Sequence, residues 1–595
     1  AAAAAVGAAV GASGALPLHC DDARRPPPQA DAAQGLSGAE DSEVEDAYVK
    51  SQVHLLKPSS HNPKPTMVPP PIEGLSGHHL RHRVVLAVVG LPLRGQAFIA
   101  HRLKNYLDFF HGAQSELFNV NDYLGPNGDE ELLEALRRHF EDASSHHGHK
   151  HAIIYTTNAL QAADAKWSGH SKSRRRWMKK ALEAELGAEL HLVEIQVNEE
   201  LEHNLMYVKS HHLAEEFGDA DTLQSHLQSF RRRFVTIQED GTEDYLQYIK
   251  VIDYNKKVVT NDMMQTFLGS RVARFLGNVH PYRHTVYLSR IGESEYVALN
   301  KIGGDSPLSA KGRSYALRLA EFADAVVDKQ AQAFACVTVD AEQAKNLRRR
   351  LANDDGHVVA VGSWEDTVAG DIDDEHNAGR VYEGMQLTRI LRDGADAFED
   401  APSAVDGVLD AVGQGPVTLI FVEPTNPETY TKVFARLWTS ALQRATQSVA
   451  FFKHPVIRVE DGKVWEQLGH REYRNLNEQY AGEYEGLTGE EIALRQPEEA
   501  ELRAKDKLGY RYPRGESYYD VIARLDDAIQ QLESYQEPVM IVAHLPVLRL
   551  LYAYMLGIPR EQAPDLKIQD HTVLHLDYDG RGNLRERRYF LGPEL

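Results

Sequence analysis

Short apolar runs alternate with segments of helical spacing along the first half of the chain. Residues 83–89 are almost wholly apolar and precede a Gly/Pro turn, after which apolar positions recur at helical spacing over 98–107. Further strand-like runs lie at 152–155, 192–197 and 248–252. Continuous apolar runs are typical of strands buried on both faces, and their alternation with helices favours a parallel sheet. The pattern therefore predicts an α/β domain.

The second half of the chain has the same character. A strand is predicted at 285–288, and the apolar runs 417–422 and 539–542 belong to this half. The N-terminal region, by contrast, is rich in Ala, Gly and Pro and shows no sustained periodicity, which is typical of disorder. The predicted organisation is a disordered extension over 1–80, one α/β domain over 81–282 and a second over 283–595.

A segment inside the second domain stands apart from the elements around it. Residues 331–436 contain a strand-like run at 335–339, helical spacing at 343–351 and a second strand-like run at 418–422. A hundred residues with their own elements are too many for a plain loop. We expect an inserted lobe that serves a partner interface.

Composition limits the classes of function. The chain has 595 residues, with Lys+Arg 65 against Asp+Glu 87 and a net charge of -22. This charge argues against nucleic-acid or anionic-membrane binding, and no apolar stretch is long enough to span a bilayer. Two cysteines give no disulfide framework, so a reducing compartment, the cytoplasm by default, is expected. Residues 1–18 are Ala/Gly-rich and uncharged and precede an acidic stretch, which is unlike an Arg-rich transit peptide, and an organellar, mitochondrial assembly is the alternative compartment.

The loop after the first apolar run has the spacing of a phosphate-binding loop. Gly90 and Gly95 stand between strand and helix, with Arg94 before the second glycine. A working loop adds a Lys for the phosphates and a Ser/Thr for Mg²⁺, and these positions are Gln96 and Ala97. Losing one such electrostatic donor typically costs roughly 10²–10³ in rate. A tight Gly/Pro turn with no ligand explains the loop about equally well.

A second set of polar residues follows strand-like runs of the second half. Arg290 ends one run, Arg444 follows another, Glu478 lies in a loop and His544 ends the run 539–542. Two arginines and a histidine at one point make a site for a phosphoryl group, and a nearby glutamate can protonate a leaving oxygen. Taken singly, each is better explained as a surface ion pair or a core histidine. Their shared position after strand ends favours a real or relict site.

These motifs together resemble the bifunctional 6-phosphofructo-2-kinase/fructose-2,6-bisphosphatase family. The resemblance covers about 83–330 and 437–580. It implies a P-loop NTPase-like domain followed by a histidine-phosphatase domain of the phosphoglycerate-mutase type with a large insertion. The segments that carry it are 90–95, 118–123, 249–253, 303–309, 438–440 and 510–518.

The resemblance also assigns roles to residues. Arg290 and Arg444 would hold the 2-phosphate of the sugar, with His544 beside them and Glu478 as general acid/base. The positions that hold the sugar's other phosphate are Arg503, Lys507 and Arg549, and those of two further kinase residues are Asn204 and Lys209. The kinase half of the family needs ATP and Mg²⁺, whereas the phosphatase half works through a phosphohistidine without a metal.

The departures from the family pattern fall on the chemistry. Ile291 stands where the family has its nucleophilic histidine, and it has no lone pair with which to attack phosphorus. A pocket tyrosine is replaced by Gly489 and a pocket glutamine by Leu545. In the kinase half, the arginine pair that clamps the sugar phosphate is the dipeptide 124–125, Leu-Gly, and Tyr155 stands where an acidic metal partner is expected.

Other polar runs give weaker signals. The histidine run 146–151 lacks a carboxylate or cysteine in register, so a solvated loop rather than a metal site is expected. The basic run 172–180 is expected to be a solvated helix face.

The sequence therefore favours a pseudoenzyme that is a structural or regulatory subunit of a larger assembly. Its phosphatase pocket is expected to retain phosphosugar binding. The alternative is a residually active enzyme of fructose 2,6-bisphosphate metabolism that controls glycolysis. No cofactor is expected, and ATP and Mg²⁺ enter only if the kinase half is active. The expected partners are other protein subunits and a phosphosugar. The resemblance also implies that the chain forms a homodimer.

Overall fold

The computed structural model describes most of the chain after residue 82. Its described residues are 83–592 apart from 143–148, 159–160, 198–219, 332, 341–342, 363, 365–380, 393–396, 398, 424–432, 459–462 and 581–582. The predicted extension 1–80, Asn204, Lys209 and part of the histidine run 146–151 lie outside the described residues. Within the described part, no helix has the length and apolar character needed to cross a bilayer. All of these residues belong to one compact unit.

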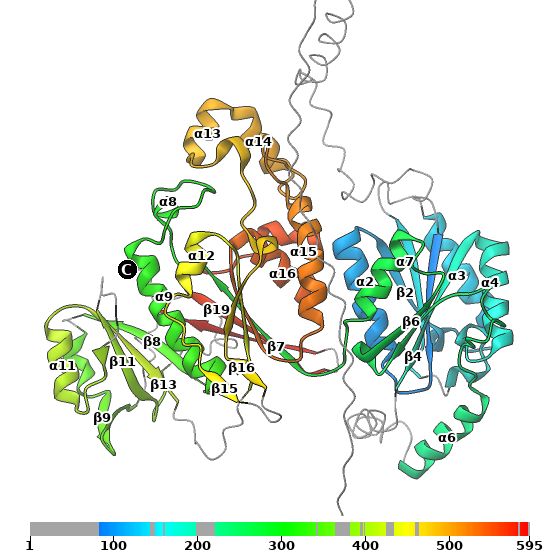
Figure 1. The fold of residues 1–595 in the computed structure, drawn as a ribbon, viewed down its shortest axis with the longest axis horizontal. Helices are drawn as coiled ribbons and strands as arrows, with labels where there is room; N and C mark the ends of the chain where they lie inside the picture. The colour runs from blue at the N-terminus through cyan, green and yellow to red at the C-terminus, as the bar shows by residue number, and fades with distance from the viewer. Residues whose placement is uncertain are drawn as a thin grey trace, which may run out of the picture. The chain divides into compact units, whose positions relative to one another are not determined.

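The first half is built on a six-stranded sheet in the order β2-β3-β1-β4-β5-β6 (Figure 1). The first five strands in this order are parallel and β6 is antiparallel to β5. Its strands are β1 Arg83–Gly90, β2 Gln114–Asn119, β3 Lys150–Tyr155, β4 Ala188–Gln196, β5 Gln247–Ile252 and β6 Lys257–Asn261. Its longer helices are α2 Gln96–His111, α3 Gly128–Glu141, α4 Lys172–Leu186, α6 Ala220–Arg233 and α7 Phe267–Leu276.

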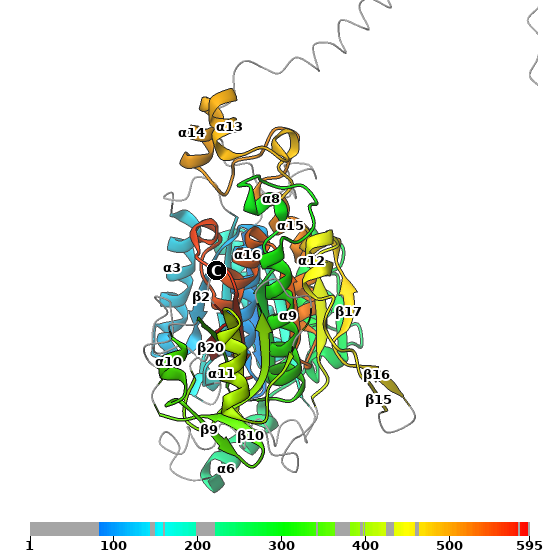
Figure 2. The same ribbon diagram turned by 90° about the vertical axis from the view of Figure 1, so that its left-hand side faces the viewer.

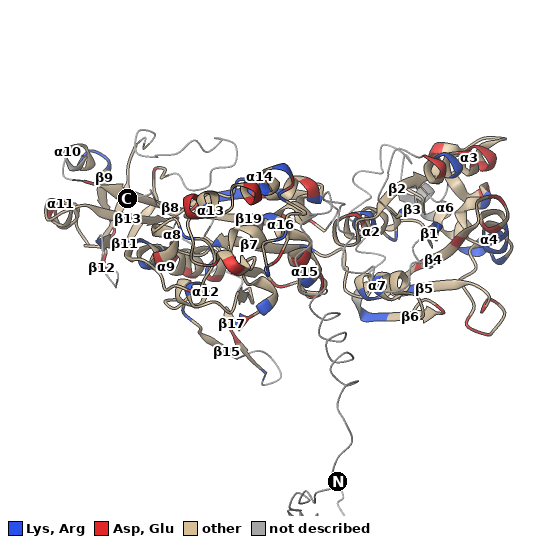
Figure 3. Cartoon of the chain, turned by 90° about the horizontal axis from the view of Figure 1, so that it is seen from above, with Lys and Arg blue, Asp and Glu red and all other residues tan. Residues whose placement is uncertain are grey.

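Sequence pattern accounts for the centre of this sheet. Every residue of β1 after Arg83 is buried, as expected for a strand with neighbours on both edges and helices on both faces. The first turn of helix α3 contains Asp129, Glu130 and Glu131, whose negative charges are stabilising at a helix N-terminus (Figure 3). The predicted α/β class is confirmed by this sheet and its helices.

The second half carries another mixed sheet, in the order β17-β14-β18-β7-β19-β20. The strands β17, β14, β18 and β7 are parallel, whereas β19 and β20 are antiparallel to their neighbours. These strands are β7 His284–Arg290, β14 Arg436–Thr439, β17 Gly469–Glu472, β18 Val539–Ala543, β19 Thr572–Tyr578 and β20 Leu584–Phe590. The longer helices are α9 Ala310–Phe322, α15 Tyr518–Glu533 and α16 Leu545–Leu556, with the shorter α12 Gln443–Ser448.

The parallel strands of the second half end at one edge of their sheet. The carboxyl ends of β7, β14 and β18 lie at the same edge of the sheet, so the residues that follow them meet there. The helices α13 Gly489–Arg495 and α14 Pro497–Lys505 lie beside α8 Glu295–Ala298 in both views (Figures 1 and 2). A backbone bridge between Lys301 and Thr488 joins the two segments.

The predicted insertion contains a sheet of its own, in the order β8-β13-β11-β10-β9, with all pairs antiparallel. The predicted helix over 343–351 is wrong beyond one turn: α10 covers Ala344–Leu347, and Leu351 begins β9 because it pairs with Ala360. The elements are β8 Phe334–Val339, β9 Leu351–Asp354, β10 His357–Ala360, β11 Gln386–Arg392, β12 Glu399–Asp400, β13 Val417–Val422 and α11 Val405–Gly413.

Candidate functional site

The glycine loop of the first half is held tightly between two elements. A Cβ atom on Gly90 would lie 2.8 Å from the carbonyl oxygen of Ile195 in β4, so only glycine fits there. Gly95 has a φ of 82° and caps α2, which is the left-handed conformation that favours glycine. The hydroxyl of Tyr254 donates a hydrogen bond to the Arg94 carbonyl oxygen at 2.5 Å. Packing therefore accounts for both glycines without a ligand.

The inside of the loop is occupied by its own side chains. The Gln96 amide donates to the Leu91 carbonyl oxygen at 2.7 Å, so it turns back onto the loop. The buried Arg94 guanidinium donates to the Pro92 carbonyl oxygen at 3.0 Å. Ala97 offers no ligand atom for a metal. In the part of the chain that the structure describes, no three His, Cys, Asp or Glu side chains are arranged to hold a metal ion.

The neighbouring strand ends are tied by uncharged side chains. The Asn121 side-chain oxygen accepts from the backbone N–H groups of Thr157 at 3.1 Å and Asn158 at 3.0 Å. Its amide donates to the Asn158 carbonyl oxygen at 2.8 Å. Leu124 is exposed where the resemblance implies a clamp for the sugar phosphate. The contacts described at this edge of the first sheet are therefore made by uncharged amide and backbone groups.

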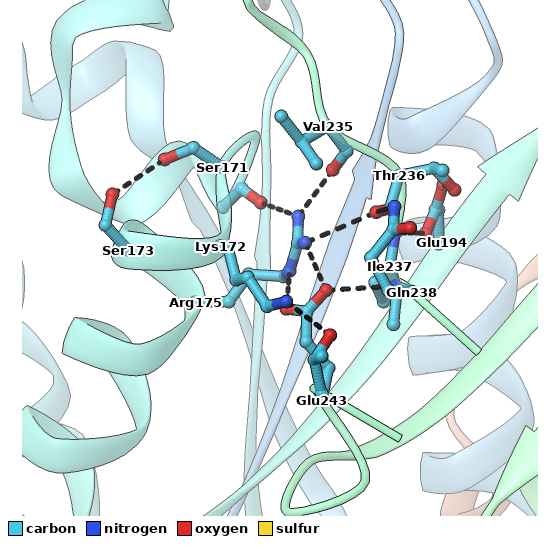
Figure 4. Close-up of polar contacts among 12 residues, drawn as sticks. Ser171, Lys172, Ser173, Arg175, Glu194, Val235, Thr236, Ile237, Gln238 and Glu243 are labelled. Carbon is cyan, nitrogen blue, oxygen red and sulfur yellow. Dashed lines mark hydrogen bonds and ion pairs between the residues drawn. The ribbon is translucent and has the colours of Figure 1, made fainter. Parts of the chain in front are cut away.

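A buried ion pair corrects the expectation for the basic run 172–180. Arg175 and Glu243 are fully buried, and their charged atoms lie 2.8 Å apart (Figure 4). Arg175 also donates to the Val235 carbonyl oxygen at 2.8 Å, and Glu194 accepts from the Ile237 N–H at 2.8 Å. The run is therefore not a wholly solvated face, because Arg175 fixes the segment around 235–243 to helix α4.

In the second half, Ile291 occupies the position after β7. Its N–H donates to the Ala543 carbonyl oxygen at 3.2 Å, which holds it beside the end of β18. Its half-buried side chain packs against an apolar cluster of this half. The next residue, Gly292, donates its N–H to the Ser448 hydroxyl at 2.9 Å. These two hydrogen bonds fix the turn after β7, with an aliphatic side chain at the position where the resemblance implies a histidine.

Both arginines of the predicted site already have acidic partners. Arg444 is buried, forms an ion pair with Glu478 and lies 3.7 Å from Asp305. Arg290 forms an ion pair with Asp570 at 2.6 Å. The guanidinium charges are therefore balanced locally, and the site is less basic than the arginines alone imply.

His544 lies beside Glu478 at the end of β18. Its Nε2 atom is 2.7 Å from the Ser440 hydroxyl oxygen, and its Nδ1 atom is 3.5 Å from a Glu478 carboxylate oxygen. Burial lowers the pKa of His544 well below its ordinary value, and the charges of Arg444 and Arg524 act in the same direction. Burial raises the pKa of Glu478, against the pull of Arg444. The imidazole is therefore neutral at pH 7.

The remaining predicted cations lie farther along the same half. Lys507 forms an ion pair with Asp565 at 2.5 Å, and Arg549 donates to the Leu566 carbonyl oxygen at 2.7 Å. Lys507 lowers the pKa of Asp565 most, and Arg549 lowers it further. Lys507 and Arg549 therefore share Asp565 as an acidic neighbour. Arg503 stacks over the Tyr512 ring, 5.6 Å from its centroid.

The two replaced pocket positions lie at helix beginnings. Gly489 begins α13 and Leu545 begins α16, directly after His544. The structure thus groups Arg444, Glu478 and His544 directly, while Arg290 turns toward the loop before β19.

Sequence reasoning missed two residues of this site. Ser440 lies within the segment 438–440 that carried the resemblance, but its contact with His544 was not foreseen. Asp570 is 280 residues from Arg290 along the chain, and no local pattern announces their pairing. The only signal for Ser440 is its place directly after β14.

Comparison with known proteins finds a family model and several relatives that are similar to this chain. Residues 428–589 match the histidine phosphatase superfamily (branch 1). The chain is 27% identical over 519 residues to a probable 6-phosphofructo-2-kinase of Schizosaccharomyces pombe, covering 82% of this chain and 67% of that one. It is 26% identical over 523 residues to 6-phosphofructo-2-kinase/fructose-2,6-bisphosphatase 3 of Rattus norvegicus, covering 83% and 69%. It is 24% identical over 513 residues to the fructose-2,6-bisphosphatase of Saccharomyces cerevisiae, covering 83% and 86%. The resemblance stated from the sequence is confirmed.

Proposed function

From its relationship to the 6-phosphofructo-2-kinase/fructose-2,6-bisphosphatase family, we propose that this chain is a pseudoenzyme. It binds a phosphosugar such as fructose 2,6-bisphosphate in its phosphatase pocket without cleaving it, and serves as a regulatory or structural subunit of a larger assembly. The observation that carries the proposal is Ile291, which stands after β7 where the resemblance implies the phosphoryl-accepting histidine.

The chemistry of isoleucine supports the absence of turnover. A phosphoenzyme needs a nucleophile with a lone pair, and an aliphatic side chain has none. Removal of the nucleophile in another hydrolase costs about a million-fold in rate. The surrounding Arg444, Glu478 and His544 remain grouped, so the capacity to hold a phosphoryl group survives better than the capacity to transfer it.

The first half supports the same proposal. Phosphoryl transfer from ATP depends on positioning and on charges supplied by a lysine and Mg²⁺. Here Gln96 is bonded to its own loop and Ala97 cannot bind a metal. The uncharged contacts of Asn121 at the neighbouring strand ends add no clamp for a second phosphate. We therefore assign this half a structural role.

Residual hydrolysis is the second candidate function. Burial raises the pKa of Glu478, which favours a carboxyl group that could protonate a leaving oxygen. Water would then have to attack phosphorus directly, because Ile291 cannot. Such an enzyme would act slowly on fructose 2,6-bisphosphate and thereby influence glycolysis.

The test is calorimetric titration of fructose 2,6-bisphosphate into the purified chain, with the ligand recovered afterwards. We expect micromolar binding that is lost in an Arg290→Ala, Arg444→Ala variant and retained in Arg436→Ala. Arg436 is a matched control because it pairs with Glu537 at 3.2 Å, at the opposite end of β14. Recovery of fructose 6-phosphate and phosphate would favour the second candidate, and absence of binding would overturn phosphosugar recognition.

A further inference from the structure

The hydroxyl of Ser440 has an unusually restricted set of partners. Ser440 is fully buried after β14, so its hydroxyl proton needs an acceptor within the protein. Its oxygen lies 2.7 Å from His544 Nε2 and accepts from the Leu442 N–H at 3.3 Å. The Leu442 N–H is a donor and cannot accept. Among the described residues, His544 Nε2 is thus the acceptor that remains.

This contact determines which tautomer His544 adopts. A neutral imidazole carries one proton, and the nitrogen that accepts a hydrogen bond is the one without it. If Nε2 accepts from Ser440, then the proton is on Nδ1. The histidine therefore presents an N–H group on the side away from Ser440.

The Nδ1 atom is buried and has no hydrogen-bond partner among the described residues. It lies 3.5 Å from Glu478 Oε2, beyond the usual length of such a bond, and Glu478 in turn is paired with Arg444. A buried N–H group without a partner is costly, so a ligand atom that accepts from it gains that free energy. The donors that converge here are the imidazole N–H and the Arg444 guanidinium.

We propose that Ser440 is a positioning residue that fixes His544 as the Nδ1–H tautomer, so that this N–H donates to an oxygen of a phosphomonoester. The ligand part of this inference rests on the proposed function. The bound oxyanion replaces the Glu478 carboxylate beside Arg444 and accepts from both donors. Tetrahedral oxyanions suit the site because donors with a positive charge hold them most strongly.

The same contact limits the chemistry of His544. Its Nε2 lone pair is engaged by the Ser440 hydroxyl, and its Nδ1 atom carries the proton. Neither nitrogen then offers a free lone pair to phosphorus. His544 accordingly cannot replace the nucleophile that is missing at Ile291, and the pocket holds the phosphoryl group without taking it.

The tautomer is tested directly by nuclear magnetic resonance of the full chain labelled with ¹⁵N-histidine. The resonances of His544 are assigned by their loss in a His544→Gln variant. We expect a protonated, pyrrole-type shift at Nδ1 and an unprotonated, pyridine-type shift at Nε2. The reverse assignment would overturn the proposal, and this readout needs neither a ligand nor a serine variant that folds.

Ligand binding is tested with inorganic phosphate and two serine variants. Ser440→Ala should bind phosphate about tenfold more weakly, the size of one hydrogen bond to a charged acceptor, and should show a mixture of tautomers. Ser440→Thr keeps the hydroxyl and should restore both properties. Ser534→Ala is the matched control, because that hydroxyl donates to the Gln531 carbonyl oxygen at the end of α15.

The outcomes separate this inference from the proposed function. If the unaltered chain binds no phosphate but shows the Nδ1–H tautomer, the proposed function and the ligand part fail while the role of Ser440 stands. If phosphate binds equally well to Ser440→Ala, or the tautomer is Nε2–H, the positioning role is overturned and phosphosugar binding stands.

Discussion

We expect Glu478 to compete with any anion that enters the proposed phosphosugar pocket. Its carboxylate is paired with Arg444 and lies 3.5 Å from His544 Nδ1, so it occupies the place where a phosphoryl oxygen would sit. A Glu478→Gln variant keeps the shape and a hydrogen-bonding oxygen but loses the negative charge. We expect it to bind fructose 2,6-bisphosphate more tightly than the unaltered chain.

The size of the effect follows from Coulomb repulsion. Two like charges about 5 Å apart repel by about 3 kcal/mol at an effective dielectric constant of about 20. The Glu478 side chain is 29% exposed, and solvent screening reduces the repulsion. Solvent screening and rotation of the carboxylate away from the ligand reduce the repulsion to about 1.4 kcal/mol. Removal of this repulsion corresponds to about a tenfold lower Kd for Glu478→Gln.

The assay is isothermal titration at several pH values, with Glu537→Gln as control. Glu537 is 33% exposed and paired with Arg436, so it matches Glu478 in type and exposure but lies outside the pocket. Because burial raises the pKa of Glu478, its carboxyl group takes up a proton at a higher pH than an ordinary glutamate. The difference in Kd for fructose 2,6-bisphosphate between the unaltered chain and Glu478→Gln should therefore become smaller as the pH falls. The protonation of the ligand itself cancels in this comparison.

Two results would refute this reasoning. Equal or weaker binding by Glu478→Gln at pH 7.5 would show that the carboxylate does not compete with the ligand. A tenfold gain in affinity for fructose 2,6-bisphosphate in Glu537→Gln as well would show that the effect comes from the overall charge of the chain rather than from the pocket.

Three further outcomes are expected. Ile291→His should release phosphate slowly from fructose 2,6-bisphosphate, and no release above an Ile291→Gln control in a phosphate assay would mean the pocket is dismantled. Arg175→Met should lower the free energy of unfolding by about 3–5 kcal/mol in urea, because it leaves the buried Glu243 charge unpaired; a loss under 1 kcal/mol would contradict this. Burial lowers the pKa of His111 to about 4, so stability should fall as the pH drops from about 6.5 to 4, by up to about 3 kcal/mol for this residue. His111→Leu should weaken that dependence in thermal melts, and an unchanged slope would exclude the buried histidine as its cause.

Much of the strand pattern could be predicted from the sequence. The run 83–89 is apolar after Arg83 and the run 539–542 is apolar throughout, and both belong to central, buried strands in the structure. The helix predicted over 343–351 fails because spacing alone does not show that Leu351 pairs with Ala360 across a turn. In that segment a long-range backbone pairing overrides helical spacing.

The candidate site divides in the same way. The identities of Gln96, Ala97 and Ile291 are local facts, and the sequence by itself determines that these positions carry no charge and that the Ala97 and Ile291 side chains have no lone pair. Their chemistry does not depend on what lies around them. The tertiary structure adds that Gln96 is bonded within its own loop, which no spacing rule states.

Tertiary structure alone decided how the remaining charges are used. Arg290 meets Asp570, Arg444 meets Glu478, and Arg175 is buried against Glu243 rather than solvated. Partners such as these come from different segments of the chain, and the packing of helices and loops on each sheet brings them within bonding distance. The sequence by itself determined which chemical groups exist at the site, and the fold determined which of them neutralise one another, because electrostatic energy depends on distance in space.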